Sequence, residues 1–185
     1  MNPRIAVPLP KAYRLLNHGP TVLVSSAHGG RRNVMAASWS MPLDFDPPKV
    51  AVVIDKSTLT RELVEASGEF VLNVPSRRQA AMTLAVGTQS GRETDKFSIV
   101  GVGAAAASLV GAPLIDGCLA WLECRVIPEP RNQQAYDLFL AEVVAAWADP
   151  AVFSNGRWHF ADDQWRSIHY LSGGSFFATG DAFDV

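Results

Sequence analysis

The chain has 185 residues, 48% of them hydrophobic and 18% charged, which suits one globular domain over residues 1–185. A formal net charge of −2, with both signs scattered, argues against a basic face for nucleic acid. No apolar run approaches the ~20 residues of a membrane helix, and three prolines interrupt the first sixteen residues. We therefore expect a cytoplasmic protein with no nucleic acid and no membrane partner.

Four short runs rich in valine, isoleucine, tryptophan or serine predict β-strands in the first half of the chain. They cover residues 21–26, 34–41, 50–55 and 69–73. The polar residues 28–33 include two glycines and favour a hairpin between the first two strands. Residues 46–48 read Asp-Pro-Pro and predict a turn, because a residue before proline is kept out of helical angles.

Helical signals follow at residues 58–68, where apolar positions share one face and Gly68 can end the helix, and at residues 77–86. Residues 119–127 predict a buried strand. Residues 136–147 favour a helix by local composition, although alternate positions also fit one face of a strand. Many short strands with one or two helices predict a mainly β fold with helical additions, a β-barrel.

Some sequence patterns that could indicate a dinucleotide site, a metal site or a disulfide do not predict one on closer inspection. Residues 101–106 resemble a dinucleotide-binding glycine motif and Glu123 lies near the expected acidic position, but later glycines and a proline leave no room for the required helix, so we expect a loop. The four histidines lack metal-ligand spacing, so we expect no metal. Cys118 and Cys124 are expected to be buried, reduced thiols.

One candidate binding segment is residues 33–39, at a strand end. The small residues Ala36, Ala37 and Ser38 would let a flat ring approach the backbone, whose N–H and C=O groups could bind its polar edge. The alternative is that small residues only permit tight packing in a barrel.

A second candidate is residues 56–61, where three hydroxyls and the cations Lys56 and Arg61 surround a predicted helix start. Unpaired N–H groups and the helix dipole favour an anion there, which predicts a phosphate site. A helix cap alone would explain Ser57 or Thr58 but would leave the other polar residues without a reason. Residues 90–97 add a loop with two further cations, although Asp95 can simply pair with a neighbour.

These segments, in this order and spacing, resemble the flavin reductase-like family and its flavoredoxin-type members. The resemblance covers most of the chain. It depends on the following stretches together, none of which is diagnostic alone: residues 21–26, 33–39, 46–48, 57–60, 67–73, 95–97 and 122–124.

The resemblance implies an FMN-binding split barrel, usually a homodimer, with flavin near the subunit interface and NADH or NADPH as reductant. It also implies a strand at residues 136–147, against the local preference, and we follow it because barrel closure can override weak propensity. The expected cofactor-binding residues are Asn33, Met35, Ala36, Ala37, Ser38, Trp39, Lys56, Ser57, Thr60, Arg61, Ser90, Arg92 and Lys96.

The function expected on this basis is hydride transfer from NAD(P)H to flavin and on to an electron acceptor, with no catalytic side chain because flavin is the reactive group. One alternative is a flavin carrier without efficient NAD(P)H turnover, and another is a cofactor-free barrel that acts as an assembly partner. Residues 170–174 and the pair Phe176-Phe177 depart from related sequences. This C-terminal segment would either cover a partner's flavin or pack a barrel edge.

Overall fold

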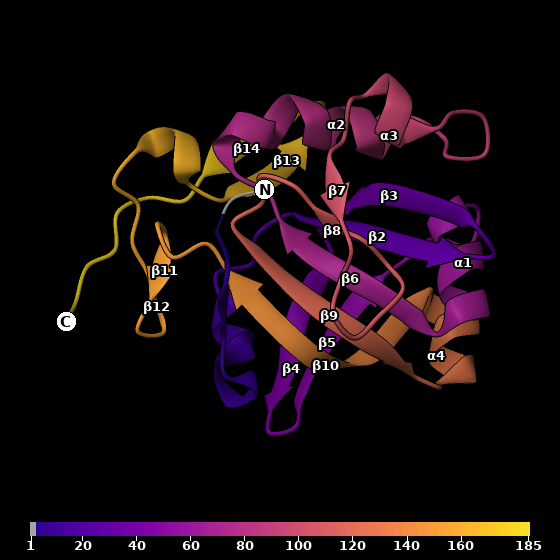
Figure 1. The fold of residues 1–185 in the computed structure, drawn as a ribbon, viewed down its shortest axis with the longest axis horizontal. Helices are drawn as coiled ribbons and strands as arrows, with labels where there is room; N and C mark the ends of the chain where they lie inside the picture. The colour runs from indigo at the N-terminus through magenta and orange to yellow at the C-terminus, as the bar shows by residue number, and fades with distance from the viewer. Residues whose placement is uncertain (1–2) are drawn as a thin grey trace.

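The computed structural model describes residues 3–185, which form one antiparallel sheet with short helices and hairpins around it (Figure 1). The elements in chain order are β1 Ile5–Ala6, η1 Leu9–Leu15, β2 Val22–His28, β3 Arg31–Ala37, β4 Ser40–Phe45, β5 Pro48–Val53, α1 Leu59–Ser67, β6 Glu69–Val74, η2 Arg77–Gln79, α2 Ala80–Thr88, α3 Lys96–Ile99, β7 Ala104–Ala105, β8 Leu114–Ile115, β9 Ala120–Ile127, α4 Pro130–Tyr136, β10 Leu138–Ala148, β11 Phe153–Ser154, β12 Arg157–Trp158, η3 Asp163–Trp165, β13 Ile168–Ser172 and β14 Ser175–Ala178.

The main sheet has the strand order β3-β2-β6-β9-β10-β5-β4, with β1 added beside β10. The two end strands, β3 and β4, are consecutive in the chain, yet within residues 3–185 they do not pair with each other. The link between them is Ser38 and Trp39, and the Trp39 carbonyl accepts a hydrogen bond of 3.0 Å from the Val53 amide. The barrel is therefore open between β3 and β4, and the mainly β, split-barrel fold is confirmed.

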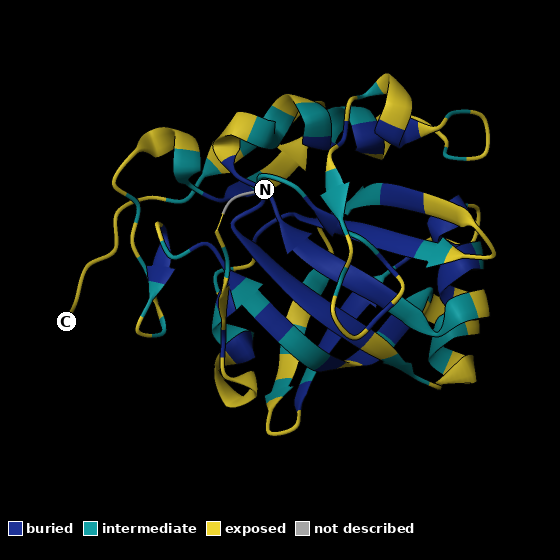
Figure 2. Ribbon diagram, in the orientation of Figure 1, coloured by how far each residue is buried: buried dark blue, intermediate teal, exposed yellow. Residues whose placement is uncertain are grey.

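The central strands are buried on both faces, which explains their nearly continuous apolar sequences (Figure 2). Phe70, Leu72 and Leu122 face a core cluster inside the barrel. Val71 and Trp121 face a second cluster on the other side, under the loops that carry β7 and β8. The sheet thus has two apolar faces, and β3 and β4 remain as its exposed ends.

Helix α1 shows why local sequence signals succeed at helix ends. The Thr58 hydroxyl accepts a 3.1 Å hydrogen bond from the Arg61 amide and caps the first turn. Gly68 ends the helix with a φ of 71°, a left-handed conformation that glycine adopts without strain. The buried residues Leu59, Leu63 and Val64 pack α1 against β2, β3 and β6, and α2 lies along β3 (Figure 1).

Two strand predictions needed correction. The single run over residues 34–41 is two strands, β3 and β4, separated by the turn at Ser38 and Trp39. The polar residues 28–33 are not all hairpin loop: Gly29 and Gly30 make the turn, whereas Asn33 pairs with Ser26 inside β3. The reversal at residues 46–48 and the strands at 50–55 and 69–73 are confirmed within one or two residues at most ends.

From Leu138 onward the stretch at residues 136–147 is a strand, β10, as the family resemblance implied, and the local preference for helix was wrong there; Tyr136 is the last residue of α4. β10 pairs with β5 on one side and β9 on the other, so tertiary pairing overrides propensity. The helical tendency appears just before it, in α4.

The glycine-rich residues 101–106 form a turn and the short strand β7 rather than a helix, as expected. Glu123 is buried and accepts hydrogen bonds from Ser108, Leu109 and the Trp147 indole, so it holds a loop in place. Both cysteines are buried thiols. Within residues 3–185, no helix is long and apolar enough to cross a membrane.

Candidate functional site

The open edge of β3 is the starting point of the site. The Lys96 ammonium donates a 2.9 Å hydrogen bond to the Val34 carbonyl, so this carbonyl points away from the paired strand β2. Main-chain groups in a strand alternate in direction from residue to residue, and the β2–β3 register has no irregularity. The N–H and C=O of Ala36 therefore also point to the open edge, where a ligand can reach them.

Helix α2 approaches this edge closely because both contacting residues are small. A Cβ atom placed on Gly87 would lie 3.1 Å from the Cβ of Ala36, which is tighter than ordinary packing. Glycine at this helical position is explained by that close approach. The result is a narrow space between α2 and β3.

Three adjoining pockets share Ala36 and together form a groove along β3. We call the first, of about 250 Å³, the α1 pocket; it is lined by Asn33, Met35, Ala36, Ser57, Thr58, Leu59, Val86, Gly87, Thr88, Gln89, Ser90, Gly91 and Lys96. The second, the corner pocket, of about 520 Å³, is lined by Met35, Ala36, Ala37, Ser38, Trp39, Val53, Asp55, Tyr136, Asp137, Tyr170 and Leu171. The third, the hairpin pocket, of about 150 Å³, lies between α2 and the β13–β14 hairpin.

The first turn of α1 borders the α1 pocket. Unpaired amides at a helix start, together with the helix dipole, favour an anion. Asp55 holds the approach to the helix, accepting hydrogen bonds from the Ser57 amide at 2.8 Å and the Ser57 hydroxyl at 2.6 Å. These hydrogen bonds hold the pKa of the Asp55 carboxyl below its usual value.

Asn33 connects β3 to α1 behind this pocket. Its side-chain amide donates a 2.9 Å hydrogen bond to the Thr60 hydroxyl, and both residues are buried. Gly91 lies against the other side of the Asn33 amide, where any Cβ atom would collide with it. Thr60 therefore orients Asn33 and, through it, the loop that covers the pocket; Thr60 itself does not line the pocket.

Lys96 is a buried cation on the wall of the α1 pocket. It is 4% exposed, and its ammonium donates to the Val34 carbonyl and, at 2.7 Å, to the Val86 carbonyl. An ammonium has three donors, so one remains beyond these two bonds. Burial lowers the pKa of Lys96 to about 8. An anion in the pocket would stabilise the charged form.

Arg92 ties the covering loop to α1 from outside. It donates to the Ser57 carbonyl at 3.3 Å and the Thr58 carbonyl at 3.4 Å and forms a 2.7 Å ion pair with Glu62. Arg31 binds the same carboxylate at 2.6 Å. These groups are exposed, so the ion pairs contribute little stability, but they fix the loop beside the helix start.

Arg61 faces away from the pocket. Its guanidinium forms ion pairs with Glu65 at 2.6 Å and Asp137 at 3.0 Å. It also donates to the carbonyls of Ile54 at 3.0 Å and Gln133 at 2.8 Å, and it stacks over Phe139. Because each of its three nitrogens already donates to a protein group and the side chain does not line the pocket, we do not propose Arg61 as a phosphate-binding residue.

The structure brings most of the expected residues together. Those that line the groove are Asn33, Met35, Ala36, Ala37, Ser38, Trp39, Ser57, Ser90 and Lys96. The expected residues Lys56, Thr60, Arg61 and Arg92 are not among the lining residues.

The sequence predictions missed Gly87, Thr88 and Tyr136 as lining residues. An isolated glycine inside a predicted helix is a sign of close backbone approach and could have pointed to Gly87. The other two carried no local signal. Tyr170, from the departing C-terminal segment, lines two of the pockets and therefore belongs to the groove.

An open antiparallel barrel with a groove along its free strand edge defines a split-barrel protein. The sequence model of the flavin reductase like domain matches residues 14–169. The chain belongs to the flavin reductase-like domain family.

Four similar proteins illustrate the relationship. An FMN-binding domain of a flavin reductases-like enzyme from Shewanella baltica is 52% identical, with a TM-score of 0.97 over 100% of this chain and 98% of that one. The uncharacterized protein YddH of Escherichia coli is 48% identical over 95% of both chains. The reductase subunit HsaB of a flavin-dependent monooxygenase from Mycobacterium tuberculosis is 30% identical over 62% of this chain and 60% of its own. Flavoredoxin of Desulfovibrio vulgaris shares the fold, with 22% identity and a TM-score of 0.79 over 90% of both chains.

Proposed function

We propose that the chain binds FMN in the groove along β3 and uses it to pass electrons from NADH or NADPH to an acceptor. The observation that carries this proposal is that the unpaired edge of β3 at Ala36 opens into a pocket bounded by the first turn of α1 and by Lys96. A flat polar ring and a phosphate on one molecule match these two ends. Bound flavin accepts hydride from a nicotinamide, so the chain has to bind, orient and shield it.

The phosphate is assigned to the α1 pocket. Its donors are the hydroxyl of Ser90 and the first-turn N–H groups of α1 that the Thr58 cap leaves without a partner. Ser57 lines the pocket, but its hydroxyl already donates to Asp55. Lys96 adds a charge in a site where burial weakens screening by water. Lys56 precedes the pocket on the exposed surface, where it adds to the positive field. Thr60 acts through Asn33, and Arg92 acts by holding the loop.

The ring system is assigned to the β3 edge between Ala36 and Trp39. The side chains at Ala36, Ala37 and Ser38 are small enough for a flat ring to contact the backbone. The outward N–H and C=O of Ala36 are one donor and one acceptor, which suits the polar edge of a flavin. Met35 and Trp39 supply apolar surface at the adjoining corner pocket.

The reductase role is supported by the family and by two relatives, one described as a flavin reductases-like enzyme and the other as the reductase subunit of a monooxygenase. The purified chain should take up FMN in a simple ratio and then oxidise NADH or NADPH. A colourless protein that does not take up FMN would remove the proposal. FMN uptake without NAD(P)H oxidation would favour the flavin carrier instead.

A second copy of the chain is the proposed partner. Alternate residues of the end strand β4 expose Met41, Leu43 and Phe45 by 54%, 45% and 63%. Trp39, 75% exposed, continues this apolar surface to the corner pocket. A surface of this kind marks an interface, and a copy docked on it would border the ring site.

A charge at the centre of that surface tests the dimer. Leu43→Glu should convert a dimer to a monomer, measured by light scattering after size-exclusion chromatography, because an interface cannot bury an unpaired carboxylate cheaply. Glu142→Gln, at an exposed position of β10, is the control and should leave the mass unchanged. A wild-type monomer at micromolar concentration would contradict the homodimer.

A further inference from the structure

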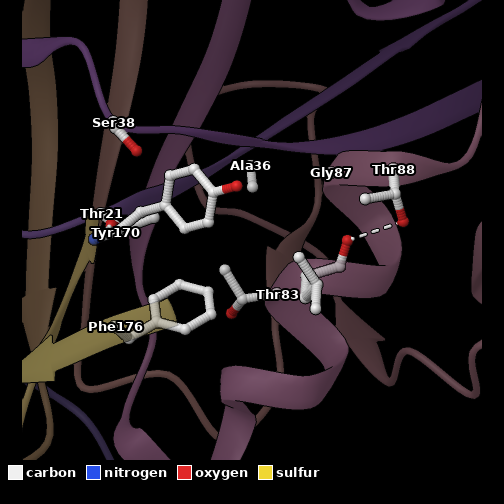
Figure 3. A pocket seen from close by; sticks show the side chains of 9 residues that line it. Thr21, Ala36, Ser38, Thr83, Gly87, Thr88, Tyr170 and Phe176 are labelled. Atoms are coloured by element: carbon white, nitrogen blue, oxygen red, sulfur yellow. Dashed lines mark hydrogen bonds between the residues drawn. The ribbon is translucent and has the colours of Figure 1, made fainter. Parts of the chain in front are cut away.

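The hairpin pocket has walls from three separate parts of the chain (Figure 3). Tyr170 and Phe176 come from the β13–β14 hairpin, α2 supplies one wall, and the β3 edge supplies the third. The residues lining it are Thr21, Ala36, Ser38, Thr83, Leu84, Gly87, Thr88, Tyr170 and Phe176. None of these nine side chains is charged, so the pocket suits a neutral ligand.

The aromatic wall is held in a fixed place. Tyr170 and Phe176 are cross-strand partners whose ring centroids lie 5.2 Å apart. The Tyr170 amide donates a 2.8 Å hydrogen bond to the Thr21 hydroxyl, and the Thr21 amide donates to the Ile168 carbonyl at 2.8 Å. These hydrogen bonds hold the hairpin against the start of β2, so the two rings have a fixed position in the wall of the pocket.

Two threonines of α2 line this pocket and differ in one respect. The Thr88 hydroxyl donates to the Leu84 carbonyl at 3.0 Å, as helical threonines commonly do. The Thr83 side chain is 1% exposed and points toward the two rings, but its hydroxyl has no hydrogen-bond partner among the described residues (Figure 3). Burying a hydroxyl without a partner is unfavourable, because its lost hydration is not compensated. A ligand that accepts its hydrogen bond would recover that cost.

The size of the pocket limits the ligand to one ring. The volume is about 150 Å³, and an apolar cavity of ~150 Å³ holds a molecule the size of benzene. A flavin or an adenine nucleotide is too large to enter it whole.

We infer that the hairpin pocket binds a neutral, single-ring compound that carries a carbonyl oxygen, with its ring packed against the wall formed by Tyr170 and Phe176 and its carbonyl accepting a hydrogen bond from Thr83. Because Ala36 lines the hairpin pocket and also the α1 and corner pockets, to which we assign FMN, the compound would lie beside the flavin; this placement rests on the proposed function. The nicotinamide ring of the reductant has the same chemistry as a free cyclic carbonyl compound. With no cation in the lining to bind dinucleotide phosphates, we assign the free compound.

Benzamide is the probe, because it has one ring and one carbonyl oxygen and is not reduced under these conditions. Its Kd, measured by ligand-observed NMR on the FMN-loaded and FMN-free chain, should rise about tenfold in Thr83→Val, the loss of one hydrogen bond. Thr83→Ser keeps the hydroxyl and should retain the wild-type Kd. Ethylbenzene, without a carbonyl, should bind wild type and Thr83→Val equally, which also verifies the fold.

An equal benzamide Kd in wild type and Thr83→Val would overturn the inference. A tetrahydro analogue of NADH that displaces benzamide and is itself weakened by Thr83→Val would assign the pocket to the nicotinamide and overturn the free compound. If Thr83→Val instead weakens FMN and benzamide never binds, the pocket belongs to the flavin, and the inference fails while the FMN proposal stands. If benzamide binds with the expected Thr83 dependence to a chain that takes up no FMN, the inference stands and the FMN proposal fails.

Discussion

Thr60 and Arg61 are neighbours in α1, but they belong to two polar clusters with opposite roles. On one side, Arg61 uses four of its five N–H donors on two carboxylates and two carbonyls and does not line the pocket. On the other side, Thr60 positions Asn33, and Lys96 lines the α1 pocket with a donor to spare. Both clusters contain a buried cation. The open pocket beside Lys96, which Arg61 lacks, separates the cluster that we propose to bind FMN from the structural cluster.

The largest expected effect is on stability and comes from removing the buried arginine of the structural cluster. Arg61→Leu should lower the free energy of unfolding by about 3 kcal/mol, because Asp137 and two carbonyls lose their buried partner. Urea unfolding measures it. The folded fraction should keep the wild-type FMN Kd. A weaker FMN complex with unchanged stability would place Arg61 in the binding cluster after all.

The next largest effect is on FMN affinity and comes from removing the Lys96 ammonium. Lys96→Met should raise the FMN Kd about 10- to 100-fold, which corresponds to a charged hydrogen bond of roughly 1.5–3 kcal/mol. Fluorescence titration at constant salt measures the Kd, and circular dichroism confirms the fold. A Kd within twofold of wild type would remove Lys96 from the phosphate site.

Lys96 also predicts a pH dependence. Its pKa is about 8 in the chain without ligand, and a bound phosphate would raise it. The complex therefore holds more protons than the free chain above pH 8, so FMN affinity should fall as the pH rises from 8 to 10. Lys96→Met should lack this fall. A similar decline in both proteins would assign the titration to another group.

Gly91→Ala should give a smaller change on the binding side. The new methyl group would collide with the Asn33 amide and displace the covering loop. A strain of about 1 kcal/mol in the closed loop would raise the FMN Kd about fivefold. Gly101→Ala, in a turn away from the groove, is the control: it should strain the backbone without changing the FMN Kd. Equal FMN affinity in Gly91→Ala and wild type would show that the loop does not cover the ligand.

The smallest effect sharpens the contrast between the two arginines. Arg92→Leu removes an exposed ion pair and should change the free energy of unfolding far less than Arg61→Leu does. Moderate salt should reduce the difference further, because exposed charges are screened. A loss as large as that of Arg61→Leu would mean that exposure does not separate these two residues.

The sequence predicted the start of α1 well because its signals are local. The Thr58 cap, the Gly68 end and the buried face lie within eleven consecutive residues. The role of Arg61 could not be predicted in the same way, since its partners Gln133 and Asp137 are more than seventy residues away. Whether a cation is free for a ligand is a tertiary property.

The strand predictions show the same difference between local signals and tertiary contacts. β10 was ambiguous locally and became a strand only through pairing on both sides. The division of residues 34–41 into β3 and β4 was missed because Ser38 and Trp39 carry no glycine or proline. That division opens the barrel and leaves Ala36 at an edge. Small residues suggested a ring-binding segment, but the register and the Lys96 contact were needed to tell which main-chain groups face outward.

The unpaired edge of β3 has a cost outside catalysis. A strand that ends a sheet offers its main chain to any other extended peptide, and such edges promote aggregation unless they are covered. α2 and the Lys96 ammonium cover part of this edge, while Ala36 stays accessible through the groove. A flat ligand bound at this edge would block the pairing of another strand with β3. Ligand binding in the groove would therefore reduce aggregation of the chain.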